Sequence, residues 1–205
     1  MPVSENIERV LQKIGTEVRI IKHDDSDPTL EYIDYEINPN DTAPFYGQHM
    51  IESTFGYNTN ADPGDLVEFV DDGSKYLIVS SNKTRFKNKL VTIESVLYKC
   101  NITGDIKRKQ TTGRDDNYNL IEEWNTIASG ESALFVGDIN DRSVDSQDYA
   151  EIYTMNPNLF ISGDVDVQSD DRFEVSADER YQIKSIEPRR LENVKICRVE
   201  KDNRE

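Results

Sequence analysis

The sequence is poor in the residues from which active sites and metal centres are usually built. It contains two histidines, two cysteines and one tryptophan among 205 residues. Cys100 and Cys197 form no CxxC pair and no metal-ligand spacing, so buried free thiols are expected and one cross-link stays open. No apolar run approaches the ~18 residues of a membrane span, and residues 1–15 lack the apolar core of a signal peptide. Synthesis in a reducing cytoplasm is therefore expected.

Recognisable catalytic and cofactor motifs are missing too. The chain has no GxSxG, no GxGxxG and no phosphate-binding P-loop. His23 follows a predicted strand beside acids and His49 lies in a predicted loop, which favours surface histidines over a catalytic base. Asp138 opens a segment like the start of an EF-hand, but Arg142 stands where the third ligand belongs and no glycine follows at the required spacing. Neighbouring acids in predicted turns are interpreted as solvated: Asp24/Asp25, Asp71/Asp72, Asp115/Asp116, Glu122/Glu123 and Asp170/Asp171. We therefore expect no enzyme, no cofactor and no metal.

Basic residues are scarce relative to acids, and apolar residues are fewer than in an average globular protein. Forty Asp and Glu oppose 24 Lys and Arg, which gives a net charge of -16, and hydrophobic residues are only 36%. Such a balance opposes the wrapping of duplex DNA, because phosphate binding needs cations to replace counterions. The charge either keeps the protein soluble or forms a surface that repels polyanions or faces a basic partner.

One helix is predicted, near the start of the chain. Its apolar residues recur at i, i+3, i+4 and i+7, namely Ile7, Val10, Leu11 and Ile14. Ser4 is a plausible N-cap, and Gly15 is placed to end the helix. A helix this short needs a packing partner, which is either the end of its own core or another subunit.

The rest of the pattern predicts strands and turns. Strands are expected at 16–22 and 30–37, in a meander over 65–101, and in short segments between 159 and 199. This predicts a mainly β fold, a small β-barrel or sandwich with a short N-terminal helix and long loops, in one domain of residues 1–205 with an irregular middle at 102–165. The expected core residues are Val67, Phe69, Ile78, Val91, Ile93, Phe173, Val175, Ile183, Val194 and Ile196.

Two segments of the chain resemble each other. Asp65–Ser80 and Asp171–Ser185 each contain an apolar strand, a turn, and a second strand opened by a basic residue and Tyr. Each is followed by another alternating strand, so the related units span 65–101 and 171–202. Either hairpins of this kind have converged, or two related β-units face each other in one sandwich or barrel. Phe69 and Phe173 are expected to hold similar places in the two hairpins.

Three surfaces are candidates for partner contacts. The loop at 38–64 is long, rich in Asn, Pro and Gly, and carries the aromatic residues Phe45, Tyr46, Phe55 and Tyr57, so a partner is expected to order it. The alternating cations Lys83, Arg85, Lys87 and Lys89 either protect a strand edge or contact an acidic partner or DNA. The acidic loop at 138–148 contains Asp138, Asp141, Asp145 and Asp148, which could face a channel and repel phosphate.

Several stretches resemble virion proteins of tailed bacteriophages, especially small neck proteins. Ile7–Ile20 (IERVLQKIGTEVRI) resembles their opening helix and strand, and Asp65–Asn101, ending VLYKCN, resembles their central strands. Asn158–Asp202, with Arg172-Phe173, resembles their closing element. Together these segments cover about half of the chain, and the middle, 103–156, resembles no such element.

The resemblance implies a neck or head-completion protein, synthesised in the host cytoplasm and built into the virion. Such a protein would form a homo-oligomeric ring between portal and tail, contact portal or adaptor and tail proteins, and help to retain DNA without binding it specifically. No membrane is implied. The alternatives are another virion component, such as a tail terminator, baseplate or fibre-attachment protein, and, from other classes, an acidic carboxylate hydrolase or a DNA-mimic binding module.

Overall fold

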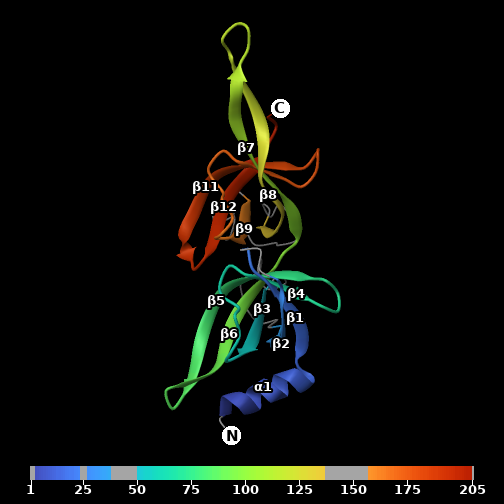
Figure 1. Ribbon diagram of the computed structural model, residues 1–205, viewed down its shortest axis with the longest axis vertical. Helices are drawn as coiled ribbons and strands as arrows, with labels where there is room; N and C mark the ends of the chain where they lie inside the picture. The colour runs from blue at the N-terminus through green and yellow to red at the C-terminus, as the bar shows by residue number, and fades with distance from the viewer. Residues whose placement is uncertain (1–2, 24–26, 38–49, 137–156, 205) are drawn as a thin grey trace, which may run out of the picture. The chain divides into compact units, whose positions relative to one another are not determined.

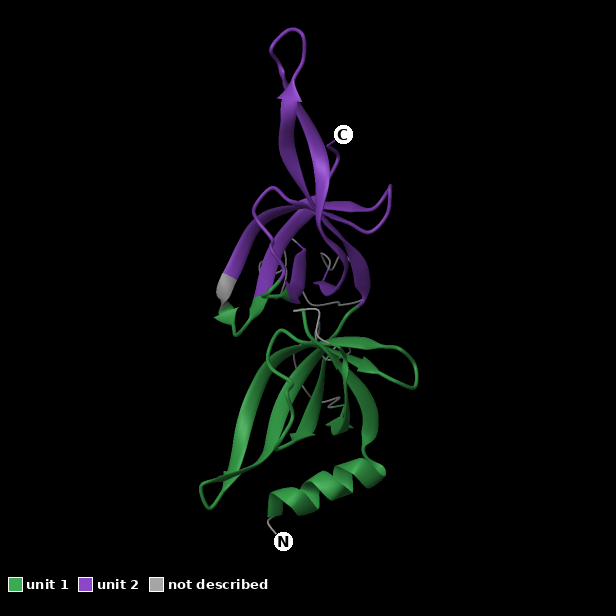
Figure 2. Cartoon of the chain, viewed as in Figure 1, with its two compact units in different colours: residues 1–100, 162–164, 189–194 green, residues 101–161, 165–188, 195–205 purple. Residues whose placement is uncertain are grey.

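The protein is described by a computed structural model that covers residues 3–23, 27–37, 50–136 and 157–204. In these residues the chain forms one helix and a series of strands closed into β-barrels, so the mainly β fold with a short N-terminal helix is confirmed. The chain divides into two compact units, shown in Figure 2: residues 1–100, 162–164 and 189–194, and residues 101–161, 165–188 and 195–205. The expectation of a single domain is thereby corrected.

Barrel 1 is a closed sheet in the order β1-β2-β3-β6-β5-β4, with β4 also paired to β1 (Figure 1). Its strands are β1 (Thr16–Ile21), β2 (Thr29–Glu36), β3 (Met50–Gly56), β4 (Leu66–Phe69), β5 (Lys75–Phe86) and β6 (Lys89–Lys99). All of the pairings in the sheet are antiparallel. β3 lies inside the predicted loop at 38–64, so that part of the loop is a strand.

Barrel 2 is a closed sheet in the order β10-β11-β12-β9-β8-β7, with β10 also paired to β7. Its strands are β7 (Ile102–Arg114), β8 (Leu120–Val136), β9 (Asn158–Ser162), β10 (Arg172–Glu174), β11 (Arg180–Leu191) and β12 (Val194–Lys201). The predicted irregular middle at 102–165 is wrong over β7 and β8, whereas β9 lies where a short strand was expected. Outside the barrel both faces of β7 and β8 are in solvent, so the sequence there has no apolar alternation to reveal a strand.

The two barrels share one topology. If β7–β12 are matched in chain order to β1–β6, the strands lie in the same order around each closed sheet. That order is first, second, third, sixth, fifth and fourth, and the fourth strand pairs with the first. The two similar hairpins found in the sequence are the fourth and fifth strands of each barrel. They belong to two separate closed sheets, however, and do not face each other within one sandwich.

The same local devices recur in the two barrels. In barrel 1, Val67 of β4 pairs with Ile20 of β1 and with Tyr76 of β5. In barrel 2, Phe173 of β10 pairs in the same way with Ile106 of β7 and with Tyr181 of β11. Just before that strand, Gly64 and Asp170 have positive φ angles of 96° and 73°. The similarity therefore extends to backbone conformation as well as to strand order.

A carboxylate holds the same turn in each barrel. Asp65 accepts hydrogen bonds from the Asp62 amide at 2.9 Å and from Lys22 Nζ at 3.1 Å. In barrel 2, Asp171 accepts them from the Gln168 amide at 2.7 Å and from Arg108 Nε at 2.8 Å. Burial raises the pKa of Asp65 above its ordinary value, against the opposing effects of these two hydrogen bonds.

Each barrel has its own apolar core. Of the ten expected core residues, nine are buried, and Val175 is half-buried against the core of barrel 2. Phe69 and Phe173 both face an apolar interior, but they are not equivalent. The strand register makes Phe173 the equivalent of Val67, which lies two residues before Phe69 on the same face of β4.

The N-terminal helix α1 (Val3–Ile14) ends as predicted, where the Gly15 amide bonds the Leu11 carbonyl at 2.7 Å. It begins one residue before Ser4, which lies in the first turn and not at the cap. Leu11 is buried, whereas Val10 is 50% and Ile14 is 81% exposed. The helix contacts β2, β3 and β6 of barrel 1, so it covers its own barrel with only part of its apolar face.

Candidate functional site

Two hairpins extend from the barrels and carry exposed side chains that neither core uses. The β5–β6 hairpin extends from barrel 1, and its tip is basic; we call residues 82–94 the basic hairpin. The β7–β8 hairpin extends from barrel 2, and its end is apolar; we call residues 114–121 the apolar tip. Figure 1 shows both ribbons running beyond the strands that close their barrels.

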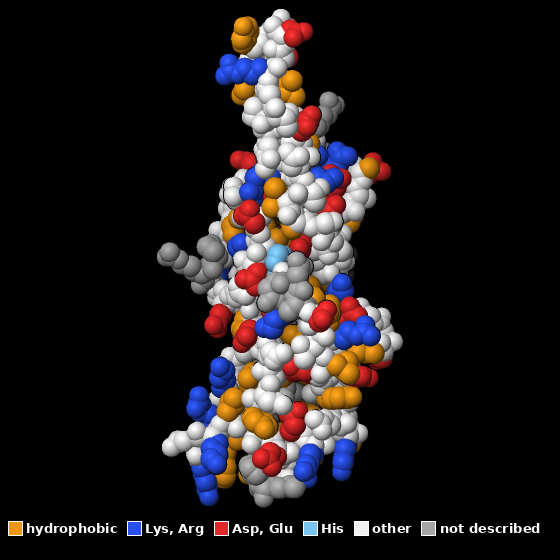
Figure 3. Space-filling view, viewed as in Figure 1, with side chains coloured by type: hydrophobic (Ala, Val, Ile, Leu, Met, Phe, Trp, Pro, Cys, Tyr) orange, Lys and Arg blue, Asp and Glu red, His pale blue; other side chains and the backbone are white. Residues whose placement is uncertain are grey.

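The basic hairpin brings together the four cations singled out in the sequence. Lys83 and Arg85 lie in β5, Lys87 lies in the turn, and Lys89 opens β6. All four are exposed, and Figure 3 shows Lys and Arg side chains gathered over this hairpin at the lower left. Within the described residues none of the four forms an ion pair with a carboxylate. Their charge is therefore available to a ligand.

The turn of the basic hairpin is tight and places its side chains outward. Phe86 pairs with Lys89, and the two residues between them, Lys87 and Asn88, have φ angles of 48° and 64°. Two positive φ angles are the mark of a type I′ turn, where Asn is common and Lys is not. Phe86 is 54% exposed, and the Lys87 Nζ lies 5.5 Å from the centre of its ring. The turn thus presents a cation and an aromatic ring together.

The apolar tip is also ordered by its own side chains. The Asp115 carboxylate accepts hydrogen bonds from the backbone amides of Asn117 and Asn119, each at 2.8 Å, and from the Asn119 side chain at 2.9 Å. Between them Tyr118 has a φ angle of 66° and is 80% exposed. Leu120 and Ile121, the next apolar residues, are 57% and 42% exposed. A large apolar group is therefore held in solvent by a preformed turn.

The β7–β8 hairpin is anchored to barrel 2 by a stack of cations on Trp124. The Arg172 guanidinium lies 3.8 Å and that of Arg204 lies 5.0 Å from the centre of the indole ring. Both arginines bond the buried Asp202, each through Nε at 2.8 Å. Burial of the Asp202 carboxyl opposes its ionisation, but the hydrogen bonds from Arg204 and Arg172 outweigh burial and hold its pKa well below the usual range.

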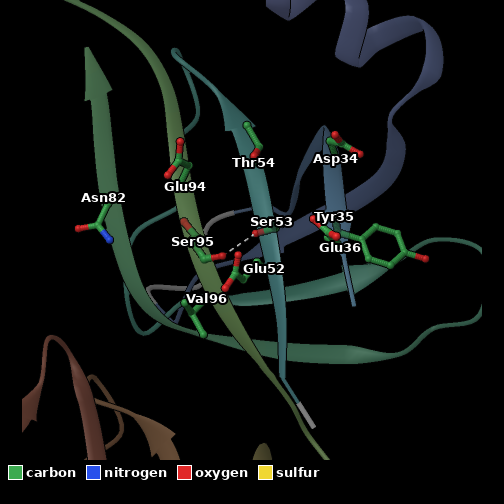
Figure 4. A pocket seen from close by; sticks show the side chains of 10 residues that line it. All are labelled: Asp34, Tyr35, Glu36, Glu52, Ser53, Thr54, Asn82, Glu94, Ser95 and Val96. Carbon is green, nitrogen blue, oxygen red and sulfur yellow. Dashed lines mark hydrogen bonds between the residues drawn. The ribbon is translucent and has the colours of Figure 1, made fainter. Parts of the chain in front are cut away.

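A shallow groove of about 330 Å³ lies on the outer surface of barrel 1 (Figure 4). Its lining residues come from β2, β3, β5 and β6, and four of them are the carboxylates Asp34, Glu36, Glu52 and Glu94. Ser53 donates to the Ser95 carbonyl at 3.3 Å in its floor, and Thr84 donates to Glu94 at 2.9 Å beside it. Across the described ranges, no cluster of three or more His, Cys, Asp or Glu is arranged to hold a metal ion.

The other residues singled out in the sequence lie in different environments. Phe55 is fully buried in the core of barrel 1, so it cannot contact a partner while the barrel is closed. The alternation of β3 turns Phe55 inward, which the Gly- and Pro-rich flanks had concealed. Tyr57 is half-buried. The remaining expected partner and channel residues lie outside the described residues, namely Phe45, Tyr46, Asp138, Asp141, Asp145 and Asp148. His49, interpreted from the sequence as a surface histidine, lies outside them as well.

Both cysteines are free thiols. Burial raises the pKa of Cys100 and of Cys197 to about 12, so both stay protonated at neutral pH. The cross-link that the sequence left open is not formed.

The apolar tip was not predicted from the sequence, because its apolar residues lie among Asn, Asp and Gly that are typical of an ordinary loop. No helix in the part of the chain that the structure describes has the length and apolar character needed to cross a membrane. Comparisons with family models, with curated proteins and with solved structures find no match to this chain.

Proposed function

We propose that this chain is a non-enzymatic structural protein of a tailed-phage particle, a neck or head-completion component that acts by assembly. In that role it would form a homo-oligomeric ring between portal and tail and contribute to DNA retention and tail docking. It would be synthesised in the host cytoplasm and reside in the virion. The observation that carries the proposal is the apolar tip, an ordered turn that holds Tyr118, Leu120 and Ile121 in solvent.

The energetics of the tip support a docking role. A residue other than glycine with positive φ stores strain, and such strain persists where the surroundings enforce it. Here three hydrogen bonds to Asp115 hold Tyr118 in that conformation. An ordered aromatic anchor loses little entropy on binding, which is why Tyr is frequent among the residues that dominate interface energies.

The phage assignment is supported by the sequence resemblance. The three resembling stretches correspond to α1 with β1, to β4–β6, and to β9–β12. The last two stretches thus contain the fourth, fifth and sixth strands of barrel 1 and of barrel 2. Two closed barrels with exposed hairpins suit a subunit that contributes contacts and no chemistry.

Incorporation into particles tests the proposal. The triple variant Tyr118→Ser, Leu120→Ser and Ile121→Ser removes the apolar tip, and loss of one such anchor cluster should weaken docking by about 30-fold or more. Mass spectrometry of purified particles should detect the wild-type chain and should detect the triple variant at strongly reduced levels. Asp116→Asn at the same tip is the matched control and should incorporate normally.

Two results would contradict the proposal. One is the absence of the wild-type chain from purified particles. The other is equal incorporation of the wild type and of the triple variant, with circular dichroism showing that both barrels are folded. A reconstruction of the particle would then identify the surface that makes the contacts.

A further inference from the structure

The basic hairpin is an exception within an acidic chain. From Gly73 to Ile93 no Asp or Glu occurs, whereas five Lys or Arg do, in a sequence where acids outnumber bases by 40 to 24. This is the segment that forms β5, the turn and the start of β6. Charged side chains, lysine above all, protect a strand edge, but edge protection does not account for the exclusion of acids from Gly73 to Ile93.

We propose that the basic hairpin binds the phosphate backbone of nucleic acid without sequence specificity. Lys83 and Arg85 alternate along β5, which spaces equivalent positions about 6.6–6.8 Å apart on one face. Lys87 and Lys89 continue the charge through the turn onto β6. Lys89 pairs with Phe86 and therefore lies on the opposite face of the ribbon from Arg85. Cations on both faces of the ribbon can contact phosphates on either side of a groove.

The shape of the hairpin suits a duplex groove. A two-stranded β-ribbon fits into the major groove of B-DNA, where its side chains can contact the phosphates on either side. Because Lys87 and Asn88 form a two-residue turn, the ribbon is narrow at its end. Phe86, 54% exposed beside Lys87, adds a ring on which an unpaired base could stack.

The choice of cations distinguishes this ligand from an acidic protein surface. Three of the four are lysines, which are depleted in protein interfaces, where arginine is preferred. Lysine serves phosphate well as a point charge. A lipid surface is disfavoured as well, because Phe86 is the only large apolar side chain exposed on the hairpin among the described residues, and membrane docking needs more buried apolar area.

The net charge of -16 does not prevent this contact. Glu94, the first acid after the acid-free stretch, is bonded to Thr84. Lys87 lies three residues further along the hairpin, about 10 Å away for an extended strand. That distance exceeds the Debye length of about 8 Å at physiological ionic strength. At Lys87, the repulsion between Glu94 and a bound phosphate is therefore largely screened.

The salt dependence of binding to a short labelled duplex tests the proposal on the full chain. With four phosphate contacts, the slope of log K against log salt should be about -3.6. The variant Lys83→Gln, Arg85→Gln, Lys87→Gln and Lys89→Gln should lose binding, and each single change should reduce the slope by about 0.9. Phe86→Ala should weaken binding to a single strand by about tenfold.

A matched control removes the same charge from elsewhere. Lys13, Lys99, Arg198 and Lys201 are exposed outside the basic hairpin and the apolar tip, and their joint replacement by Gln should preserve at least most of the slope. The proposal is overturned if the two quadruple variants bind equally. It is also overturned if the hairpin variant loses only self-association in sedimentation, or only binding to anionic vesicles, with no nucleic-acid binding by the wild type. Particle incorporation is a separate readout, so this inference and the assembly role can fail independently.

Discussion

Asp202 keeps an ionised carboxyl inside barrel 2 because two arginines bond it. Its side chain is fully buried, and Arg172, which is 3% exposed, would keep only the longer 3.9 Å contact with the Glu174 carboxylate if Asp202 were removed. Breaking one side of a buried ion pair is far more damaging than removing a surface pair. The Trp124 ring adds a second contact to the same arginine. These residues together fasten the C-terminal segment to the sheet.

Asp202→Asn should destabilise barrel 2 by about 3–5 kcal/mol at neutral pH. The free energy of unfolding of the variant should also fall less steeply as the pH is lowered. The folded pKa of Asp202 is lowered, so the carboxylate contributes stability above its unfolded pKa, and that contribution is lost as pH falls below about 5 towards the folded pKa. Urea unfolding at a series of acidic pH values measures both effects. Asp116→Asn, an exposed change, should leave the curve unaltered, and a wild-type acid limb in Asp202→Asn would refute the assignment.

Phe173→Ala should cost about 3–5 kcal/mol, because Phe173 is fully buried in the core of barrel 2. Phe69→Ala should cost a comparable amount in barrel 1, where Phe69 is 5% exposed and packs against Tyr35 and Tyr76. Hydrogen exchange followed by peptide mass spectrometry should localise each loss of protection to the barrel that carries the change. Phe86→Ala, on the surface, should alter stability by no more than about 0.5 kcal/mol. Equal losses in both barrels from either change would contradict separate cores.

Among elements, strands with one buried face were predictable and those without one were not. Leu66–Val70 places Val67 and Phe69 on one face, and Tyr76–Ser80 is a short apolar run that follows a turn, so the meander could be predicted directly. Gln110 and its neighbours up to Arg114 are all exposed, so neither face of β7 carries an apolar signal there. The contact of Trp124 with Arg172 joins residues far apart in the chain, and single-sequence periodicity contains no information about such pairs.

Asp115→Ala should loosen the apolar tip and leave barrel 2 intact. The amides of Asn117 and Asn119 lose their acceptor, so their hydrogen exchange should accelerate, while the β7–β8 pairing below the tip stays protected. Amide-resolved exchange by NMR measures the effect. Asp116→Ala is the control at the neighbouring acid. Unchanged exchange at Asn117 and Asn119 in Asp115→Ala would mean that the turn is held by other contacts.

At the scale of the molecule, the similar hairpins were visible in the sequence, but the complete repeat was not. Asp65 and Asp171, with their matching strands, pointed to related units. The first three strands of each barrel differ greatly in length, with β1 of 6 residues and β7 of 13. Their equivalence therefore depends on pairing order, which only the folded chain reveals.

Fragments 1–101 and 102–205 should each fold when expressed separately, because each contains a closed sheet and its own apolar core. Dispersed amide resonances and cooperative thermal unfolding of each fragment would confirm the expectation. A fragment cut between β7 and β8, at Asn117, is the control and should not fold, since it divides a barrel. If neither 1–101 nor 102–205 folds, the two cores depend on each other.

The single tryptophan allows the fluorescence of one barrel to be distinguished from that of the other. Trp124 belongs to barrel 2 and lies under two guanidinium groups, which are close enough to influence its excited state. Its emission therefore reports on the anchoring of the β7–β8 hairpin and is blind to barrel 1. The hairpin can therefore be followed in the unlabelled protein, with the first barrel contributing only tyrosine and phenylalanine background.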